Sequence, residues 1–483
     1  MKEIVAREKE VKELEEVLLS GSAEFLAIYG RRRIGKTFLI HQFFQDKGLY
    51  FEFTGIKDAP LSTQLKNFTV VFADLFLKGE PMPTFKTWVD ALTALRYQLE
   101  KSKDSRRIIL FFDELPWIST PQSGFLQAFE HFWNRYISRD HRVILVVCGS
   151  AAAWMIRHIL DARGGLHGRV TRIMRLIPFN LNETERFLKS RRIELDRKQI
   201  VEIYMAMGGV AQYLSQIKRG LSSSQIIQEV CFSESGLLSR EFYRLYSSLF
   251  ENYERHIGVI KVLANHSTGL SRDLLLRELG LESGGSISKV LNELEESGFI
   301  LSVPSYGKKK VGGFFRLIDP FSLFYLKWIE KADLKMGQLE KNYWTKQQSS
   351  QGWAAWSGYV FENICLMHID QIKWALGLSA VTSIQSQWSY RASGKQGAQI
   401  DLVIDRADQC INLCEIKFYK SEFSINKEYA DVLERKKNCF YEQTKSKKTL
   451  FTTLITSFGA KKNAHYLKVV DQHLDLNALY HPL

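Results

Sequence analysis

The sequence has few cysteines, and their distribution excludes two classes of protein. Six cysteines are scattered over 483 residues, unlike the dense framework of a disulfide-stapled secreted domain. Cys410 and Cys414 have no second cysteine pair at the spacing of a zinc site. We therefore expect core thiols in a protein from a reducing compartment.

Long apolar runs are also missing. The longest candidate, residues 143–156, is interrupted by Gly149 and Ser150 and falls short of the roughly eighteen apolar residues that a membrane span needs. The first residues of the chain lack the apolar segment of a signal peptide. These absences predict a cytoplasmic protein with no membrane segment.

Negative charge is the scarcer sign. The chain has 53 Asp and Glu against 66 Lys and Arg, a net charge of +13, which favours an anionic partner. No basic amphipathic membrane helix stands out, so we expect nucleic acid, with DNA favoured, before a membrane surface. A length of 483 residues suggests about three domains, and a homo-oligomer is left open.

A phosphate-binding loop follows an apolar run at residues 25–29 that has the pattern of a buried parallel strand. The next eight residues match G-x-x-x-x-G-K-[ST], a Walker A loop for ATP. Gly30 and Gly35 let the backbone aim several N–H groups at the phosphates. Lys36 then reaches the β- and γ-phosphates, and Thr37 places its hydroxyl on Mg²⁺. A helix predicted directly after the loop adds the positive end of its dipole.

Two carboxylates end a second buried strand, residues 108–112. Ligands lie beyond the carboxyl ends of the strands in open α/β sheets, so Asp113 is expected beside Mg²⁺ and Glu114 is expected to activate the attacking water. A further strand at residues 143–150 brings Ser150 to this edge as a candidate γ-phosphate sensor. Two more strands are expected at residues 49–53 and 172–177, and a helix is expected at residues 84–99. The alternation indicates an α/β fold, a doubly wound parallel sheet within residues 1–180.

Helical patterns fill residues 181–250, where Gly208 and Gly209 interrupt one helix. Before them, a glycine-rich loop ends in Arg169. Two interpretations of Arg169 stay open: a guanidinium that stabilises charge during phosphoryl transfer, or a solvated loop residue.

In this order, the motifs of the first half resemble the archaeal-type ATPase family, a STAND-like relative of AAA+ ATPases. The motifs that carry the resemblance are Arg7-Glu8, the loop from Gly30 to Thr37, Asp113-Glu114, Gly149-Ser150, Gly168-Arg169 and Gly208-Gly209. The resemblance implies that Arg7 and Glu8 lie near the adenine, that Ser150 is a sensor and that residues 181–250 form a nucleotide-responsive lid. The chain departs from the family at Ala6, usually glycine, and at Ala211, usually proline.

Residues 251–318 have the pattern of a winged helix. Three helices are expected, followed by two strands, at residues 257–263, 270–279, 287–294, 299–303 and 313–317. The turn between the strands contains Lys308, Lys309 and Lys310. These lysines suit phosphate contacts at the edge of a DNA groove, although a solvated hairpin tip is the alternative. On the third helix, Glu293, Glu295 and Glu296 would repel DNA.

After a helical connector at residues 319–350, a C-terminal domain is expected over residues 351–483. A helix there carries Glu362, and two later strands form a hairpin. Alternate residues of a strand share a face, so Glu415 and Lys417 project together, and Asp401 on the partner strand meets them. This predicts a Mg²⁺ hydrolytic centre in which Asp401 and Glu415 hold the metal and Lys417 positions water or stabilises the phosphate.

This set resembles the PD-(D/E)xK nuclease superfamily. Glu362 matches its helix glutamate, Asp401 its central aspartate, and Glu415 and Lys417 the two ends of its E-x-K. The resemblance implies a restriction-endonuclease-like α/β domain with these four as catalytic residues. Ile400 stands where the superfamily's name has proline.

The sequence thus predicts an ATP-hydrolysing protein whose nucleotide state gates a Mg²⁺-dependent nuclease domain acting on DNA. Two alternatives stay open. One is a nucleotide-switched, STAND-like regulator that binds DNA or protein through a non-catalytic nuclease-like domain. The other is an ATPase that remodels a protein partner.

Overall fold

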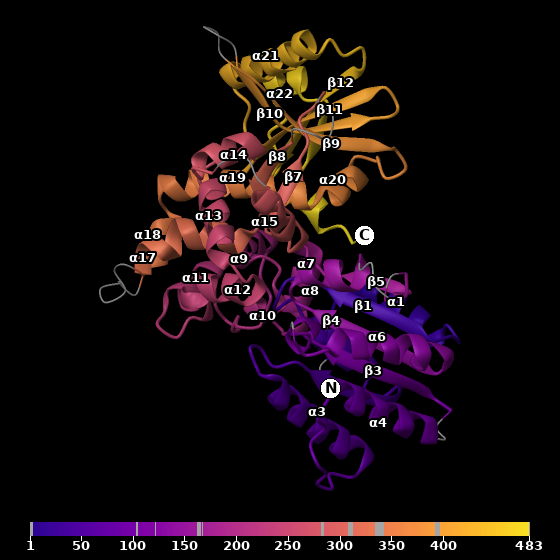
Figure 1. Cartoon of the computed structure of the whole chain (residues 1–483). Helices are drawn as coiled ribbons and strands as arrows, with labels where there is room; N and C mark the ends of the chain where they lie inside the picture. The colour runs from indigo at the N-terminus through magenta and orange to yellow at the C-terminus, as the bar shows by residue number, and fades with distance from the viewer. Residues whose placement is uncertain are drawn as a thin grey trace. The chain divides into compact units, whose positions relative to one another are not determined.

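The computed structural model describes residues 3–102, 105–120, 122–161, 166, 168–281, 285–307, 313–333, 342–391 and 397–482. The chain divides into two compact units, Met1–Ile177 and Pro178–Leu483, called here the first and second units. The elements are labelled in Figure 1. The finer domain boundaries from the sequence stay predictions.

Five parallel strands form the sheet of the first unit, in the order β2-β3-β4-β1-β5. They are β1 (Glu24–Tyr29), β2 (Gly48–Thr54), β3 (Arg107–Asp113), β4 (Val143–Gly149) and β5 (Arg172–Arg175). All five strands expected from the sequence are confirmed, although β5 ends two residues early. Because β4 lies between β1 and β3, the loops after these three strands are neighbours at one edge of the sheet.

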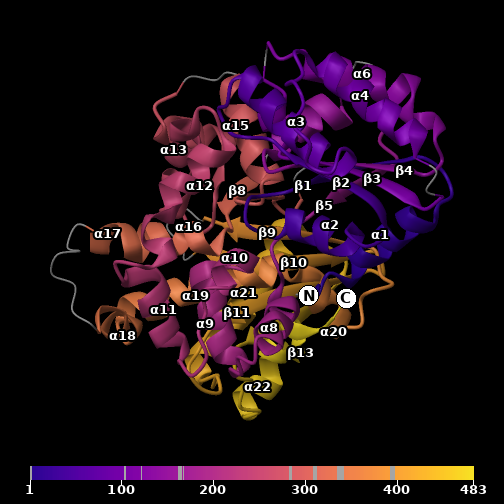
Figure 2. The same ribbon diagram turned by 90° about the horizontal axis from the view of Figure 1, so that it is seen from below.

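Helices cover both faces of this sheet, as Figure 2 shows, with α3, α4 and α6 on one side and α1 and α2 on the other. The helices are α1 (Glu8–Leu19), α2 (Lys36–Phe44), α3 (Leu61–Phe76), α4 (Trp88–Lys101), α5 (Leu115–Ile118), α6 (Phe125–Arg135) and α7 (Ala152–Met155), with short turns η1 (Ile137–Arg139) and η2 (Ile156–Leu160). The parallel α/β prediction is confirmed for this unit.

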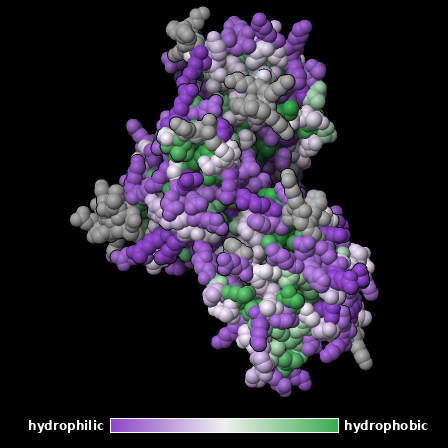
Figure 3. Space-filling model, viewed as in Figure 1, coloured by the Kyte–Doolittle hydropathy of each residue, from purple (hydrophilic) through white to green (hydrophobic). Residues whose placement is uncertain are grey.

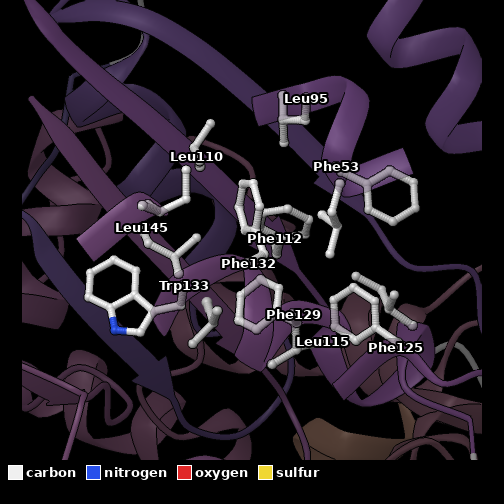
Figure 4. Packing of buried hydrophobic residues seen from close by; sticks show 14 of the residues in the cluster. Phe53, Leu95, Leu110, Phe112, Leu115, Phe125, Phe129, Phe132, Trp133 and Leu145 are labelled. Carbon is white, nitrogen blue, oxygen red and sulfur yellow. The ribbon is translucent and has the colours of Figure 1, made fainter. Parts of the chain in front are cut away.

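An aromatic core lies between the sheet and helices α3, α4 and α6. Figure 4 shows Leu110 and Phe112 of β3 turned toward Phe129 of α6, and the Phe112 and Phe129 rings meet edge to face at 5.2 Å. Alternate residues of β3 supply these contacts because they share a face. This packing fixes β3, and with it the carboxylates at its end.

One local expectation for the first unit was wrong. Helix α4 begins at Trp88 rather than at residue 84, because the Thr87 side chain caps it by accepting a hydrogen bond from Asp90 N at 3.1 Å. Helix α3 lies in residues 54–83, where no element was expected, although Leu65, Phe68 and Phe72 have helical spacing and are buried.

The second unit begins with the helices α8 (Leu181–Ser190), α9 (Arg197–Met207), α10 (Ala211–Leu214), α11 (Ser223–Phe232), η3 (Leu237–Arg240) and α12 (Glu241–Leu249). The expected break after α9 is confirmed. Gly208 has a φ of 63°, and a Cβ at Gly209 would lie 1.8 Å from the Phe179 carbonyl oxygen. A side chain at Gly209 would therefore separate α9 from the chain that leads into α8.

Next come α13 (Tyr253–Ala264), β6 (Leu270–Ser271), α14 (Arg272–Glu278), α15 (Gly285–Glu296), β7 (Ile300–Val303) and β8 (Phe314–Leu317). The three expected helices and two expected strands are present. Residues 270–279 are not helical throughout, because Leu270 and Ser271 form an additional strand and the Ser271 side chain caps α14. The strands form an antiparallel sheet in the order β6-β8-β7, called here the three-stranded sheet.

Short helices then connect to the C-terminal segment: α16 (Pro320–Phe324), η4 (Tyr325–Ile329), α17 (Glu330–Asp333) and α18 (Tyr343–Gln348). The segment itself contains α19 (Gln351–Met367), α20 (Ile369–Ala375), β9 (Ser383–Tyr390), β10 (Ala398–Arg406), β11 (Cys410–Lys417), α21 (Lys427–Thr444), β12 (Thr449–Thr456), α22 (Ala464–Val469), β13 (Gln472–Leu474) and η6 (Leu476–Tyr480).

The C-terminal strands form a mixed sheet in the order β13-β12-β11-β10-β9. Strands β9, β10 and β11 are antiparallel, whereas β12 and β13 run parallel to β11. The predicted β10–β11 hairpin is confirmed. Helix α21 packs on this sheet through Phe440, which joins Val403 and Leu413 in one apolar cluster.

Most of the coloured surface in Figure 3 is hydrophilic. On the face drawn in Figure 3, apolar side chains occur in small scattered groups. Within the described residues, no helix combines the length and apolar composition needed to cross a bilayer.

Candidate nucleotide and carboxylate sites

The loop after β1 has the backbone of a phosphate cradle. Gly30 must be glycine, because a Cβ there would lie 2.1 Å from the Leu176 carbonyl oxygen. Gly35 has a φ of 96°, and no atom lies within 4 Å of where its Cβ would be. Glycine thus permits both the tight loop and a close approach of a ligand to its backbone.

Lys36 is the first residue of α2 and is 5% exposed. Its Nζ donates to two carbonyl oxygens of the loop, those of Gly30 at 2.9 Å and Arg31 at 3.0 Å. These contacts hold the ammonium group against the loop without neutralising its charge. An anionic phosphate is therefore the natural partner for Lys36.

Thr37 and Asp113 meet as the sequence predicted. The Thr37 hydroxyl donates to Asp113 Oδ2 at 2.7 Å, and the other carboxylate oxygen accepts from Glu114 N at 2.9 Å. A hydroxyl and a carboxylate side by side, close to a buried lysine, fit Mg²⁺ bound together with nucleotide phosphates.

Glu114 and Ser150 are bonded to each other. Ser150 donates to Glu114 Oε2 through its hydroxyl at 2.8 Å and its backbone N–H at 3.1 Å. Glu114 has a left-handed backbone with a φ of 47°. Burial raises the pKa of Glu114, and the nearby charge of Lys36 only partly offsets that increase. Ser150 thus holds the candidate base, and its contact with γ-phosphate stays a prediction.

Arg7 lies against the phosphate loop. Its Nη2 donates to the carbonyl oxygens of Ile177 at 2.7 Å and Ile34 at 3.5 Å. Ala6 and Arg7 both have positive φ values, 60° and 73°. This conformation gives a physical reason for the glycine that the resembled family has at the position of Ala6. An adenine contact by Arg7 stays a prediction.

In the second unit, Glu415 is bonded by three side chains. Its Oε1 is 2.7 Å from Lys417 Nζ and accepts from the Tyr429 hydroxyl at 2.6 Å. Its Oε2 accepts from Lys436 Nζ at 2.7 Å. The expected meeting of Glu415 and Lys417 on β11 is confirmed. Tyr429 and Lys436 come from α21 and were not foreseen, although their spacing of two helical turns places them on one face.

Asp401 is buried beside Glu415 with a different environment. Its Oδ2 accepts from Ile416 N at 3.0 Å. Burial, followed by the charges of Glu415 and Glu362, raises the pKa of Asp401 to about 7. Burial also opposes ionisation of Glu415, but Lys417 and Lys436 lower its pKa overall. Two adjacent carboxylates with separated pKa values and a nearby lysine fit a divalent cation and an anionic substrate.

The third carboxylate, Glu362 of α19, accepts from Arg316 Nη2 at 2.9 Å. Arg316 belongs to β8 of the three-stranded sheet, and no sequence pattern indicated it. Among the described residues, no group of three or more His, Cys, Asp or Glu side chains is arranged to hold a metal ion. Mg²⁺ commonly uses one or two carboxylates, completed by water and substrate phosphate.

Comparison with known proteins identifies the first part of the chain. Residues 4–217 match the model of a family described as an ATPase domain predominantly from Archaea. This region is similar to an archaeal-type P-loop ATPase domain. Over 449 residues, the chain is 22% identical to an uncharacterized protein of Methanocaldococcus jannaschii, covering 90% of this chain and 92% of that protein.

Two solved structures were also matched. A Walker-type ATPase of Pyrococcus abyssi covers 67% of this chain and 96% of its own, with 16% identity and a TM-score of 0.45. The ORC2 protein of Aeropyrum pernix, in ADPNP and ADP complexes, covers 70% and 96%, with 16% identity and a TM-score of 0.42.

The structure does not test the roles predicted for the remaining residues. Lys308, Lys309 and Lys310 fall outside the described residues. Arg169 is exposed, and neither interpretation of it is favoured by a contact. On α15, Glu293 Oε2 is 2.8 Å from His256 Nε2, and Glu295 accepts from Ser302 N at 2.9 Å. These two acids thus have partners in the fold, and their effect on DNA stays a prediction.

Proposed function

We propose that the protein is an ATP hydrolase whose nucleotide state controls a Mg²⁺-dependent, nuclease-like C-terminal domain that acts on DNA. The observation that carries the first part is the contact between Thr37 and Asp113 beside Lys36 and Glu114. It supplies a hydroxyl and a carboxylate for Mg²⁺, a cation for phosphate, and a base for water.

In the ATPase site, each residue has a separate task. Lys36 and the loop N–H groups bind the phosphates, while Thr37 and Asp113 would hold Mg²⁺, which neutralises charge on the transferred phosphoryl group. Glu114 orients water and accepts its proton. A raised pKa makes Glu114 a better proton acceptor, because a carboxylate near its pKa takes a proton readily.

In the C-terminal domain, Asp401 and Glu415 would hold Mg²⁺, and Lys417 would bind the scissile phosphate. Burial of both carboxylates beside a lysine supports this assignment, and the bonded hairpin gives them a rigid support. We also propose that residues 251–318 are a winged-helix DNA-binding domain. Its element order and the net charge of +13 support a nucleic-acid partner.

One observation favours a second function, that of a nucleotide-switched binding protein. Glu415 already has two lysines bonded to it, and Glu362 has an arginine. The site therefore balances its charges without a metal, as an inherited, non-catalytic site would. In this function, the C-terminal domain holds DNA or protein and cleaves nothing.

Incubation of the purified protein with supercoiled plasmid, with and without ATP and Mg²⁺, separates the two functions. Nicked or linear DNA in the wild type, absent in Asp401→Ala, supports the nuclease. Loss of ATP-dependent cleavage in Lys36→Ala supports control by nucleotide. If DNA and RNA substrates all stay intact in Mg²⁺ and in Mn²⁺, the binding protein is the better account.

A further inference from the structure

Arg316 is buried, and its guanidinium contacts the C-terminal segment rather than its own sheet. Nη2 donates to Glu362 Oε2 at 2.9 Å, and the guanidinium carbon is 5.2 Å from the centre of the Tyr359 ring. The Gln387 amide of β9, in the orientation that satisfies both of its ends, accepts from Nη1 at 2.8 Å and donates to Thr268 O at 3.1 Å. The residue is only 1% exposed.

The chain after β7 is attached to the same strand, β9. Gln387 N donates to Pro304 O at 3.0 Å, and Tyr306 N donates to Gln387 O at 2.9 Å. The Tyr306 ring packs on Phe440 of α21, with centroids 4.9 Å apart. Because β9 is an edge strand of its sheet, these contacts cover backbone groups that an edge leaves open. Main-chain and side-chain contacts together hold the three-stranded sheet against the C-terminal site.

The role of Glu362 therefore differs from that of Asp401 and Glu415. Its charge acts on Asp401, so it belongs to the same electrostatic site. However, the bond to Arg316 occupies one of its oxygens and offsets its charge. A divalent cation that approaches Asp401 and Glu415 meets a glutamate that is already neutralised.

We propose that Arg316 is a positioning residue of the C-terminal site, which acts by holding Glu362 as a neutralised anchor outside the metal shell. This inference rests on the proposed metal site. It replaces the catalytic role expected for Glu362 with a structural and electrostatic one. It also makes the three-stranded sheet part of the site, because the sheet supplies the cation.

Mn²⁺ binding to nucleotide-free, full-length protein tests this role by isothermal titration calorimetry. An Asp113→Asn background removes the carboxylate that is proposed to hold metal in the ATPase site. In that background we compare four proteins: Arg316 and Glu362 intact, Arg316→Met, Glu362→Gln, and the double variant. Arg316→Met should bind Mn²⁺ about tenfold tighter and Glu362→Gln about tenfold weaker, since each changes one charge near the cation.

The double variant is the decisive protein, and it is expected to fold because neutral groups replace both members of a buried pair. Its affinity should return to that of the protein with both residues intact. If it stays as weak as Glu362→Gln, Glu362 is a metal ligand and the inference is overturned. Equal affinities in all four proteins would overturn it as well, because the pair would then be only structural.

Two controls separate this inference from the metal site on which it rests. Arg197→Met breaks a more exposed ion pair with Glu185, 3.3 Å long and in helices α8 and α9, and should leave Mn²⁺ affinity unchanged. Asp401→Asn should abolish the binding. If Mn²⁺ binding is absent from the start, or persists in Asp401→Asn, the metal site itself fails and the inference fails with it.

Discussion

The two candidate sites hold their carboxylates with different kinds of donor. In the P-loop ATPase domain, the donors are neutral: Thr37 bonds Asp113 at 2.7 Å, and Ser150 bonds Glu114 at 2.8 Å. The cation at the start of α2, Lys36, is held by carbonyl oxygens instead of carboxylates. The carboxylates and the lysine therefore keep their charges, and a bound ligand can neutralise both.

In the C-terminal domain, the donors are mostly cations. Lys417 and Lys436 each lie 2.7 Å from Glu415, and Arg316 lies 2.9 Å from Glu362. A metal ion must therefore displace a lysine that is already in place. The ATPase site should respond to its ligand directly, whereas the C-terminal site should respond only after its ion pairs rearrange.

The largest effect is expected at the ATPase site, where Lys36 is held against the phosphate loop by two carbonyl oxygens. Lys36→Ala removes the cation that faces the phosphates and should lower ATP turnover at least about a hundredfold. Phosphate release measures the turnover, and a fluorescent ATP analogue measures the binding. Lys57→Ala, an exposed lysine elsewhere in the same unit, is the control. Undiminished turnover in Lys36→Ala would place ATP hydrolysis at another site.

Glu114→Gln should separate binding from chemistry. The amide still accepts from Ser150 but takes no proton from water, so we expect ATP binding to persist while turnover falls about a hundredfold. Ser150→Ala should slow turnover less, since Glu114 stays present and loses only the hydrogen bond from the Ser150 hydroxyl, while the bond from the Ser150 N–H remains. If Ser150→Ala abolishes ATP binding while Glu114→Gln does not, Ser150 contacts nucleotide directly.

The contrast between the sites also explains what the sequence could predict. Residues 30–37 form a contiguous motif. Asp113 and Glu114 end a strand whose apolar run predicts burial, and the strand order of a parallel sheet brings these carboxylates close to the motif. Glu415 and Lys417 share a face because they are two residues apart. Arg316 and Lys436 reach their carboxylates only through packing of distant elements, which no local period records. Helical spacing alone also did not reveal that Tyr429 faces Glu415.

At the C-terminal site, Lys436→Met should make metal binding easier, because it frees Glu415 Oε2 and removes one positive charge. We expect Mn²⁺ affinity to rise about tenfold. Lys437→Met is a matched control on the same helix, since Lys437 pairs instead with Asp471 at 3.3 Å. If both variants bind Mn²⁺ as the wild type does, Lys436 does not compete with metal and the contrast between the sites is smaller than the geometry suggests.

The smallest expected effect is a change of stability with pH, which tests whether ionisation of Asp401 destabilises the C-terminal site without metal. The pKa of Asp401 in the folded protein is raised to about 7, above the value of an exposed aspartate. Between pH 4 and pH 7 the folded state thus keeps a proton that the unfolded state has lost, and stability falls as pH rises. Asp401→Asn keeps an oxygen for Ile416 N but cannot ionise. Its melting temperature relative to the wild type should therefore increase by roughly 3 °C between pH 5 and pH 8.

Differential scanning calorimetry in EDTA measures the difference in melting temperature between the two proteins, and a second series with Mg²⁺ tests whether metal binding changes it. At pH 8, Mg²⁺ should raise the melting temperature of the wild type, because the cation binds the ionised Asp401, and should leave Asp401→Asn unchanged. A difference between the two proteins that stays constant with pH would mean that Asp401 is ionised throughout. The lysines would then neutralise the charge of Asp401 as well as that of Glu415, and the site would bind metal more weakly.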